Sequence, residues 1–239
     1  MSDRDRFFEG LRRALGRTPE AKLPAVPPAG SRHEEVKADA EARAGELLAE
    51  LEVSAAQAGW QVHRAASTVE ASEYVATLAA GLEARSVVCT THAVLDRLGL
   101  AALLAEAGRE LHTIAMNGTG AEPPDAQRAE HRERALAADM GVTGVDYAIA
   151  ETGSCAIVAR KGVSRLASLL PPVHVAVVER GQVLPSLDEL FALRRHSHVQ
   201  GDAGSYMNII SGPSRSGDIE QTLVTGVHGP REVHMVLLG

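Results

Sequence analysis

From residue 60 onward, short apolar runs alternate with segments that have helical periodicity. The runs at 86–90 and 111–116 are typical of buried strands. The helix-like segments around them are 72–82, 93–107 and 125–138. Strands that alternate with helices are joined by crossovers, which place the strands in parallel. We therefore expect an α/β fold with a doubly wound, mostly parallel sheet.

The rest of the chain extends this pattern. An Ala-, Glu- and Leu-rich stretch from 31 to 58 predicts one long helix, which ends at Gly59 and leads into a short strand at 60–63. Further apolar runs predict strands at 147–150, 155–159, 174–178, 207–210 and 232–238, with a helix around 187–195. We assign residues 31–239 to one α/β domain.

Residues 1–30 are predicted to form an N-terminal arm. Phe7, Phe8, Leu11 and Leu15 recur at helical spacing, and a proline-rich stretch at 24–28 cannot continue the helix. A helix this short is marginal alone and must find apolar surface. It either packs on its own domain or docks on another subunit, and the sequence leaves both open.

Composition excludes several classes of protein. The formal charge is −7 and aromatic residues make up 3% of the chain, so a nucleic-acid partner is not expected. No apolar stretch approaches the length of a membrane span, and the N-terminus is charged, which predicts a cytoplasmic protein. Cys89 and Cys155 are far apart and outside any CxxC, so they predict neither an iron–sulfur cluster nor a zinc site.

Four loops combine Gly or Pro with polar residues: 151–154, 168–174, 211–220 and 226–232. Loops at the carboxyl ends of parallel strands form the ligand crevice of such sheets, and we expect these four to converge there. The predicted ligand-binding residues are Thr152, Gly153, Ser154, Pro172, Ser211, Gly212, Ser214, Arg215, Asp218, Glu220, Gly229 and Arg231.

The 211–220 segment is expected to precede a short helix capped by Ser214 or Ser216, whose free N–H groups would face an anion. An ordinary capped helix start is the simpler alternative. Arg215 and Arg231 favour the anion site, because a guanidinium recognises a carboxylate through two hydrogen bonds.

Three residues are candidates for catalysis. Glu151 follows a predicted buried strand, where low dielectric would perturb a carboxylate, so it is a candidate base or nucleophile. His174 and His228 lie in Gly/Pro loops and are candidate proton carriers. Each of the three has a structural alternative, as a hydrogen-bonded side chain that ties loops together. His196 and His198 are weak evidence for a metal, and we predict none.

Four sequence blocks, at 141–154, 168–174, 210–215 and 226–232, resemble the LUD domain of the lactate utilization protein C family in order and spacing. The resemblance implies a fold similar to the group of sugar-phosphate isomerases and CoA-transferases. It also implies a place in a bacterial system that oxidises L-lactate to pyruvate, whose partner subunits, lactate utilization proteins A and B, carry the iron–sulfur clusters. No cofactor is then expected in this chain.

The leading hypothesis is an accessory, non-redox subunit that binds a small carboxylate or anionic ligand. A second hypothesis is a stand-alone isomerase or an acyl- or CoA-transferase that uses Glu151. A third is an assembly factor without catalysis, whose arm contacts a partner. Fold analogy alone does not decide among these, because one fold supports unrelated chemistries.

Overall fold

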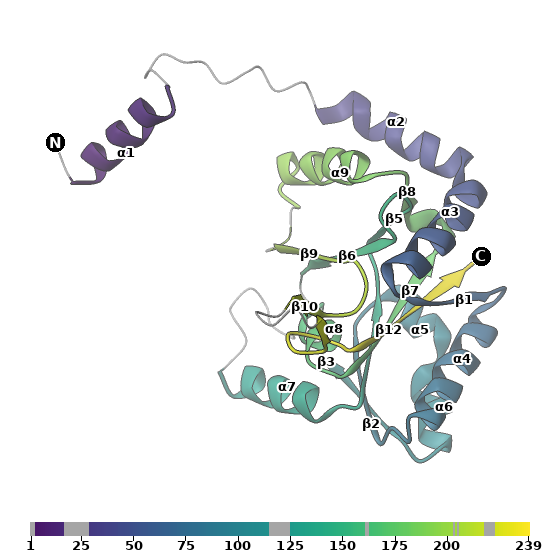
Figure 1. The fold of residues 1–239 in the computed structure, drawn as a ribbon. Coiled ribbons are helices and arrows are strands. Elements are labelled where there is room, and N and C mark those ends of the chain that lie inside the picture. The colour runs from purple at the N-terminus through teal and green to yellow at the C-terminus, as the bar shows by residue number, and fades with distance from the viewer. Residues whose placement is uncertain are drawn as a thin grey trace.

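The structure is a computed structural model that describes residues 3–16, 29–114, 125–160, 163–202, 204, 206–217 and 223–239. Within these ranges six parallel strands form a central sheet in the order β1-β12-β7-β4-β2-β3 (Figure 1). The strands are β1 (Gln61–Ala65), β2 (Ser86–Thr90), β3 (Glu110–Ile114), β4 (Met140–Gly144), β7 (Val173–Glu179) and β12 (Glu232–Leu238). The predicted α/β class with a mostly parallel sheet is confirmed.

The sheet is buried on both faces, because alternate side chains of each strand enter different apolar clusters. Val175 and Val177 of β7 join the cluster formed with α4, α5 and α6, whereas Ala176 and Val178 point to the opposite cluster. The first group is α4 (Thr68–Gly81), α5 (Ala93–Leu98) and α6 (Leu100–Glu106). The opposite face is covered by α3 (Ala44–Ala58), α7 (Asp125–Ala137), α8 (Leu166–Leu169) and a second layer of strands.

That second layer is a separate sheet, which the sequence pattern did not predict. In the described part of the chain its order is β8-β5-β6-β9, with β5–β6 and β6–β9 antiparallel. Its strands are β5 (Tyr147–Ile149), β6 (Ser154–Ala159), β8 (Val183–Leu184) and β9 (Tyr206–Ile210). The predicted strands at 147–150, 155–159 and 207–210 therefore exist but belong to this sheet. Helix α9 (Leu187–Val199) packs beside it.

Two predicted helices are each divided in two. The expected helix at 31–58 is α2 (Ala29–Ala42) followed by α3, with the break at Arg43. The expected helix at 93–107 is α5 and α6, because Gly99 adopts a left-handed φ of +62° that interrupts the helical hydrogen bonds. No helix in the described ranges combines the length and apolar character needed to cross a membrane.

The predicted N-terminal helix is α1 (Asp3–Ala14), and none of its residues is buried. Phe7 is 66% exposed and Leu11 44% exposed, and Phe8 and Leu15 are exposed as well. Of the two alternatives for this arm, packing on its own domain is therefore not found. Docking on another subunit stays a prediction.

Candidate functional site

The four loops singled out in the sequence come together through a chain of direct contacts. Ser154 Oγ lies 2.6 Å from Ser211 Oγ, which joins the first loop to the third. The backbone N–H of Ser214 donates to Pro230 O at 2.9 Å, and that of Arg231 donates to Pro172 O at 3.0 Å. We call residues 151–154, 168–172, 211–217 and 226–231 the four-loop cluster.

The cluster lies at the opposite edge of the sheet from the one expected. The 168–172 segment immediately precedes β7, and the 226–231 loop immediately precedes β12. These loops therefore meet at the amino ends of two neighbouring parallel strands. The expectation that they form a crevice at the carboxyl ends was wrong.

Three hydroxyl groups form a short hydrogen-bonded row in the cluster. Thr152 Oγ1 donates to Ser154 Oγ at 2.8 Å, and Ser154 Oγ in turn contacts Ser211 Oγ. Ser154 is only 1% exposed, so its hydroxyl depends on these partners. The turn that presents Thr152 is pressed against α3: a Cβ added at Gly153 would lie 2.4 Å from the carbonyl of Ser54.

The 211–217 segment does not lead into a helix at the predicted position. Instead β10 (Arg215–Gly217) pairs antiparallel with β11 (Leu223–Thr225), so Ser214 and Ser216 cap no helix there. Ser214 Oγ accepts a hydrogen bond from the backbone N–H of His228 at 3.3 Å. The predicted capped-helix cradle is therefore replaced by a hairpin that is tied to the 226–231 loop.

The arginines of the cluster have different surroundings. Arg215 Nη2 donates to Ala58 O at 3.4 Å, at the carboxyl end of α3, where a positive charge complements the helix dipole. Gly212, with φ +99°, makes this end of α3 accessible, since a Cβ there would lie 2.2 Å from Ala58 O. Arg215 and Arg231 are both exposed, but only Arg215 is held by this contact with α3, and Gly229 lies against Ser214. Arg231 is thus better placed than Arg215 to meet an external anion.

The catalytic candidates also lie in different surroundings. Glu151 is exposed, and its backbone N–H donates to Pro185 O at 3.0 Å, so the buried environment expected for its carboxylate is not found. His228 and Pro172 are exposed. The roles of Glu151 and His228 as base and proton carrier stay predictions. Asp218 and Glu220 lie outside the described residues.

His174 is a core residue of β7, not a loop residue as expected. Its Nε2 contacts Thr143 Oγ1 at 2.8 Å, and its ring lies 6.1 Å from that of Trp60. Complete burial, with a smaller effect of nearby His234, lowers the pKa of His174 from 6.5 to about 3. The imidazole is therefore neutral at physiological pH, which weakens its candidacy as a proton carrier.

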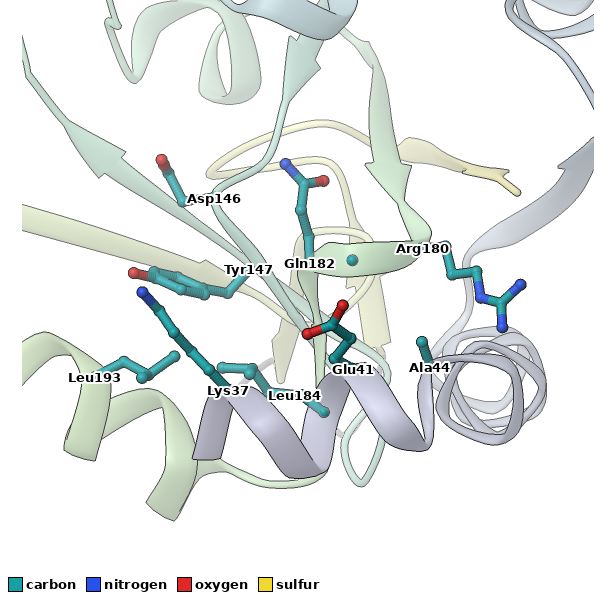
Figure 2. Close-up of a pocket in the computed structure, with 11 residues that line it drawn as sticks. Lys37, Glu41, Ala44, Asp146, Tyr147, Arg180, Gln182, Leu184 and Leu193 are labelled. Carbon is teal, nitrogen blue, oxygen red and sulfur yellow. The ribbon is translucent and has the colours of Figure 1, made fainter. Parts of the chain in front are cut away.

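The structure also reveals a cavity that sequence reasoning missed. It has a volume of about 600 Å³ and lies at the carboxyl ends of β4 and β7, bounded by α2, α3, α9, β5 and the 3-10 helix η1 (Arg180–Gln182) (Figure 2). Its polar lining residues are Lys37, Glu41, Asp146, Tyr147, Arg180 and Gln182. One signal was available: Lys37 and Glu41 are four residues apart and share a face of a helix. Asp146 and Arg180 lie far from them in sequence, so no sequence pattern groups these residues with Lys37 and Glu41.

Comparison with known proteins identifies the family. The LUD domain profile matches residues 48–238, which is most of the chain. The chain belongs to the LUD domain family. A solved structure, a DUF162 family protein from Deinococcus radiodurans determined at 1.70 Å, has the same fold, with a TM-score of 0.54 and 20% identity over 82% of this chain and 98% of that one.

Curated relatives of this LUD domain chain are named for lactate utilization. It is 39% identical over 102 residues to lactate utilization protein C of Halalkalibacterium halodurans, covering 41% of this chain and 43% of the relative. It is 26% identical over 234 residues to lactate utilization protein B of Shouchella clausii, covering 80% of this chain and 48% of the relative. The chain spans about half the length of the curated relatives it matches. The predicted membership of the lactate utilization protein C family is confirmed.

Proposed function

We propose that this chain is the C-type, non-redox subunit of a bacterial system that oxidises L-lactate to pyruvate. The observation that carries the proposal is the combination of a LUD domain match with relatives named lactate utilization protein C at 32–39% identity. The partner subunits are proteins of the A and B types. A B-type relative that matches 80% of this chain supports the link to such a system.

Oxidation of a 2-hydroxy acid needs an electron acceptor, and we place it in iron–sulfur clusters of the partner subunits. The two cysteines of this chain support that division. Cys89 and Cys155 are both buried and free, and burial raises the pKa of the Cys155 thiol to about 12. Neither sulfur is therefore poised as a thiolate ligand, which fits the proposal that the iron–sulfur clusters belong to the partner subunits.

The proposed role of the four-loop cluster is to bind a small carboxylate or another anion. Support comes from two features of this cluster: the exposed cation of Arg231, and the exposed Ser211 at the end of the hydroxyl row that starts at Thr152 and passes through the buried Ser154. Glu151 lies at the start of the same cluster. The ligand then contacts side chains that come from three separate segments of the sequence.

Genetic deletion in the native host tests the proposal. We expect a strain without this chain to lose growth on L-lactate as sole carbon source and to keep growth on pyruvate, with restoration by the wild-type chain. Affinity purification from lactate-grown cells should recover a partner that shows an iron–sulfur signal in electron paramagnetic resonance. Unimpaired growth of the deletion strain on L-lactate, with no second copy in the genome, would refute the proposed function.

A second function, assembly of the complex, is favoured by one observation. The arm helix α1 exposes Phe7, Phe8, Leu11 and Leu15 without burying any of its residues. An amphipathic helix in this state gains stability by placing its apolar face in a groove of another protein. We propose that α1 recruits one of the iron–sulfur subunits.

A further inference from the structure

The cavity beside α2 occupies the position where open parallel sheets bind their ligands. Asp146 and Tyr147 come shortly after the carboxyl end of β4, and Arg180 comes directly after the carboxyl end of β7. Because β4 and β7 are neighbours in the sheet, their following residues share one edge. Ligands of such folds bind outside the carboxyl ends of the strands, and a volume of about 600 Å³ is in the range of small-molecule pockets.

The floor of the cavity is apolar. Ala40 and Ala44 come from α2 and α3, Leu184 from β8 and Leu193 from α9, and all four are buried. The half-buried ring of Tyr147 adds an aromatic wall. These surfaces would be covered by an apolar or planar group, since removing apolar area from water is favourable by roughly 25 cal/mol per Å².

The rim of the cavity is charged and only partly neutralised. Asp146 accepts hydrogen bonds from Arg160 at 2.5 Å and from the backbone N–H of Val158 at 2.7 Å, so its charge is compensated. Lys37, Glu41 and Arg180 form no ion pair with the residues that the structure describes. Lys37 and Glu41 therefore face the cavity with opposite charges, and Arg180 adds a cation at its edge, where the guanidinium lies against Gly45 of α3. This arrangement favours a ligand that carries a carboxylate.

Lys37 and Glu41 have an informative geometry. They are four residues apart on α2 and line the same cavity, yet their charged atoms are not within ion-pair distance. Figure 2 shows Glu41 between Lys37 and Arg180, with Lys37 extending from α2 toward Tyr147. A cation and a carboxylate side by side can hold two adjacent groups of one ligand, one that accepts hydrogen bonds and one that donates them.

We propose that this cavity binds a carboxylate with a hydroxyl or amino group on the neighbouring carbon and an apolar side chain. Lys37 donates to the ligand carboxylate, and the ligand hydroxyl or ammonium group donates to Glu41. The side chain lies on Leu184, Leu193 and the Tyr147 ring. Lactate has the two polar groups but only a methyl as its side chain, so it leaves most of the cavity unfilled and binds weakly.

The test is calorimetry on the full-length chain with L-3-phenyllactate, L-phenylalanine, 3-phenylpropionate and L-lactate. We expect saturable binding of phenyllactate or phenylalanine, at least about tenfold tighter than that of phenylpropionate, which lacks the donor, and than that of lactate, which lacks the apolar side chain. The tighter of the first two ligands identifies the donor group. Absence of binding by both up to 10 mM, about the limit of specific recognition, overturns the proposal.

Variants of α2 locate the site. Lys37→Met should weaken binding about tenfold or more through loss of a charge-assisted hydrogen bond, and Arg64→Gln, which removes one positive charge from β1, should not. Ala40→Leu should block binding by filling the cavity, whereas Ala38→Leu, on the exposed side of α2, is the matched control. Lys37 is exposed, so its variant remains informative if Ala40→Leu fails to fold.

Amide chemical-shift mapping with the tighter ligand separates this inference from the proposed function. Changes confined to α2, Tyr147 and η1 support the cavity, whereas changes confined to 211–217 and 226–231 overturn it and favour the four-loop cluster. Because this experiment measures direct binding and the proposed function is tested by growth on lactate, either can fail without the other.

Discussion

Replacing Gly153 by Ala tests whether the first loop of the four-loop cluster is packed against α3. Gly153 has φ +62°, and an added Cβ would lie 2.4 Å from the Ser54 carbonyl and 2.5 Å from the Ala55 nitrogen, which are backbone atoms that cannot rotate away. Gly99 has the same φ of +62° but open space around its Cβ position. The two substitutions share the backbone cost and differ in the steric one.

The left-handed backbone costs an alanine about 1–2 kcal/mol at either position. Overpacking adds about 1–3 kcal/mol, and we expect this addition at Gly153 only. For a chain of this size each kcal/mol lowers Tm by roughly 2–4 °C, so Gly153→Ala should melt about 2–12 °C below Gly99→Ala. Thermal unfolding followed by the fluorescence of Trp60, the single and buried tryptophan, measures the difference in Tm. An equal decrease in Tm in both variants would refute the packing of this loop on α3.

Three further outcomes are expected. The pKa of His174 is about 3 in the folded chain and 6.5 in the unfolded chain. Between pH 3 and pH 6.5 the imidazole is therefore protonated only in the unfolded chain. Stability is full above pH 6.5 and falls as the pH drops below it. Between pH 6.5 and pH 5 the free energy of unfolding of His174→Gln, measured by urea titration, should fall by about 2 kcal/mol less than that of wild type. The same pH dependence of this free energy in both proteins would contradict the prediction. In calorimetry, pyruvate should bind to the wild type and should not bind to Arg231→Ala. If pyruvate does not bind to the wild type, the proposed anion site is refuted. Deletion of residues 1–28 should leave Tm unchanged and abolish co-purification of the iron–sulfur partner. If the partner still co-purifies, the arm is not its docking site.

Elements whose signal is local were predicted well from the sequence. The apolar run at 86–90 is strand β2, and the charged periodic segment at 125–138 is helix α7 within one residue. Gly59 ends α3 with a left-handed φ of +100°, as its place after the helical segment indicated. The division of the strands between two sheets was not predictable, because pairing joins distant segments: β6 pairs with β9 about fifty residues later.

The errors at the site have a similar origin. The 168–172 and 226–231 segments each precede an apolar run, so their order in the chain already placed them at amino ends of strands. The burial of His174 and the exposure of Glu151 depend on which layer covers each strand, and periodicity does not report this. The cavity joins α2 with residues more than one hundred positions later in the chain, and only the tertiary structure brings them together.

Strand β7 connects the two candidate sites. Its amino end lies under the four-loop cluster, and its carboxyl end leads directly to Arg180 at the cavity. Seven strand residues span about 20 Å, so one small carboxylate cannot contact both Arg231 and Lys37. The strand between them is buried in two apolar clusters and makes parallel pairs on both sides, which leaves little room for a local shift. Two ligands are therefore needed to fill the two sites, and a chain with both sites occupied would hold two carboxylates at opposite edges of one sheet.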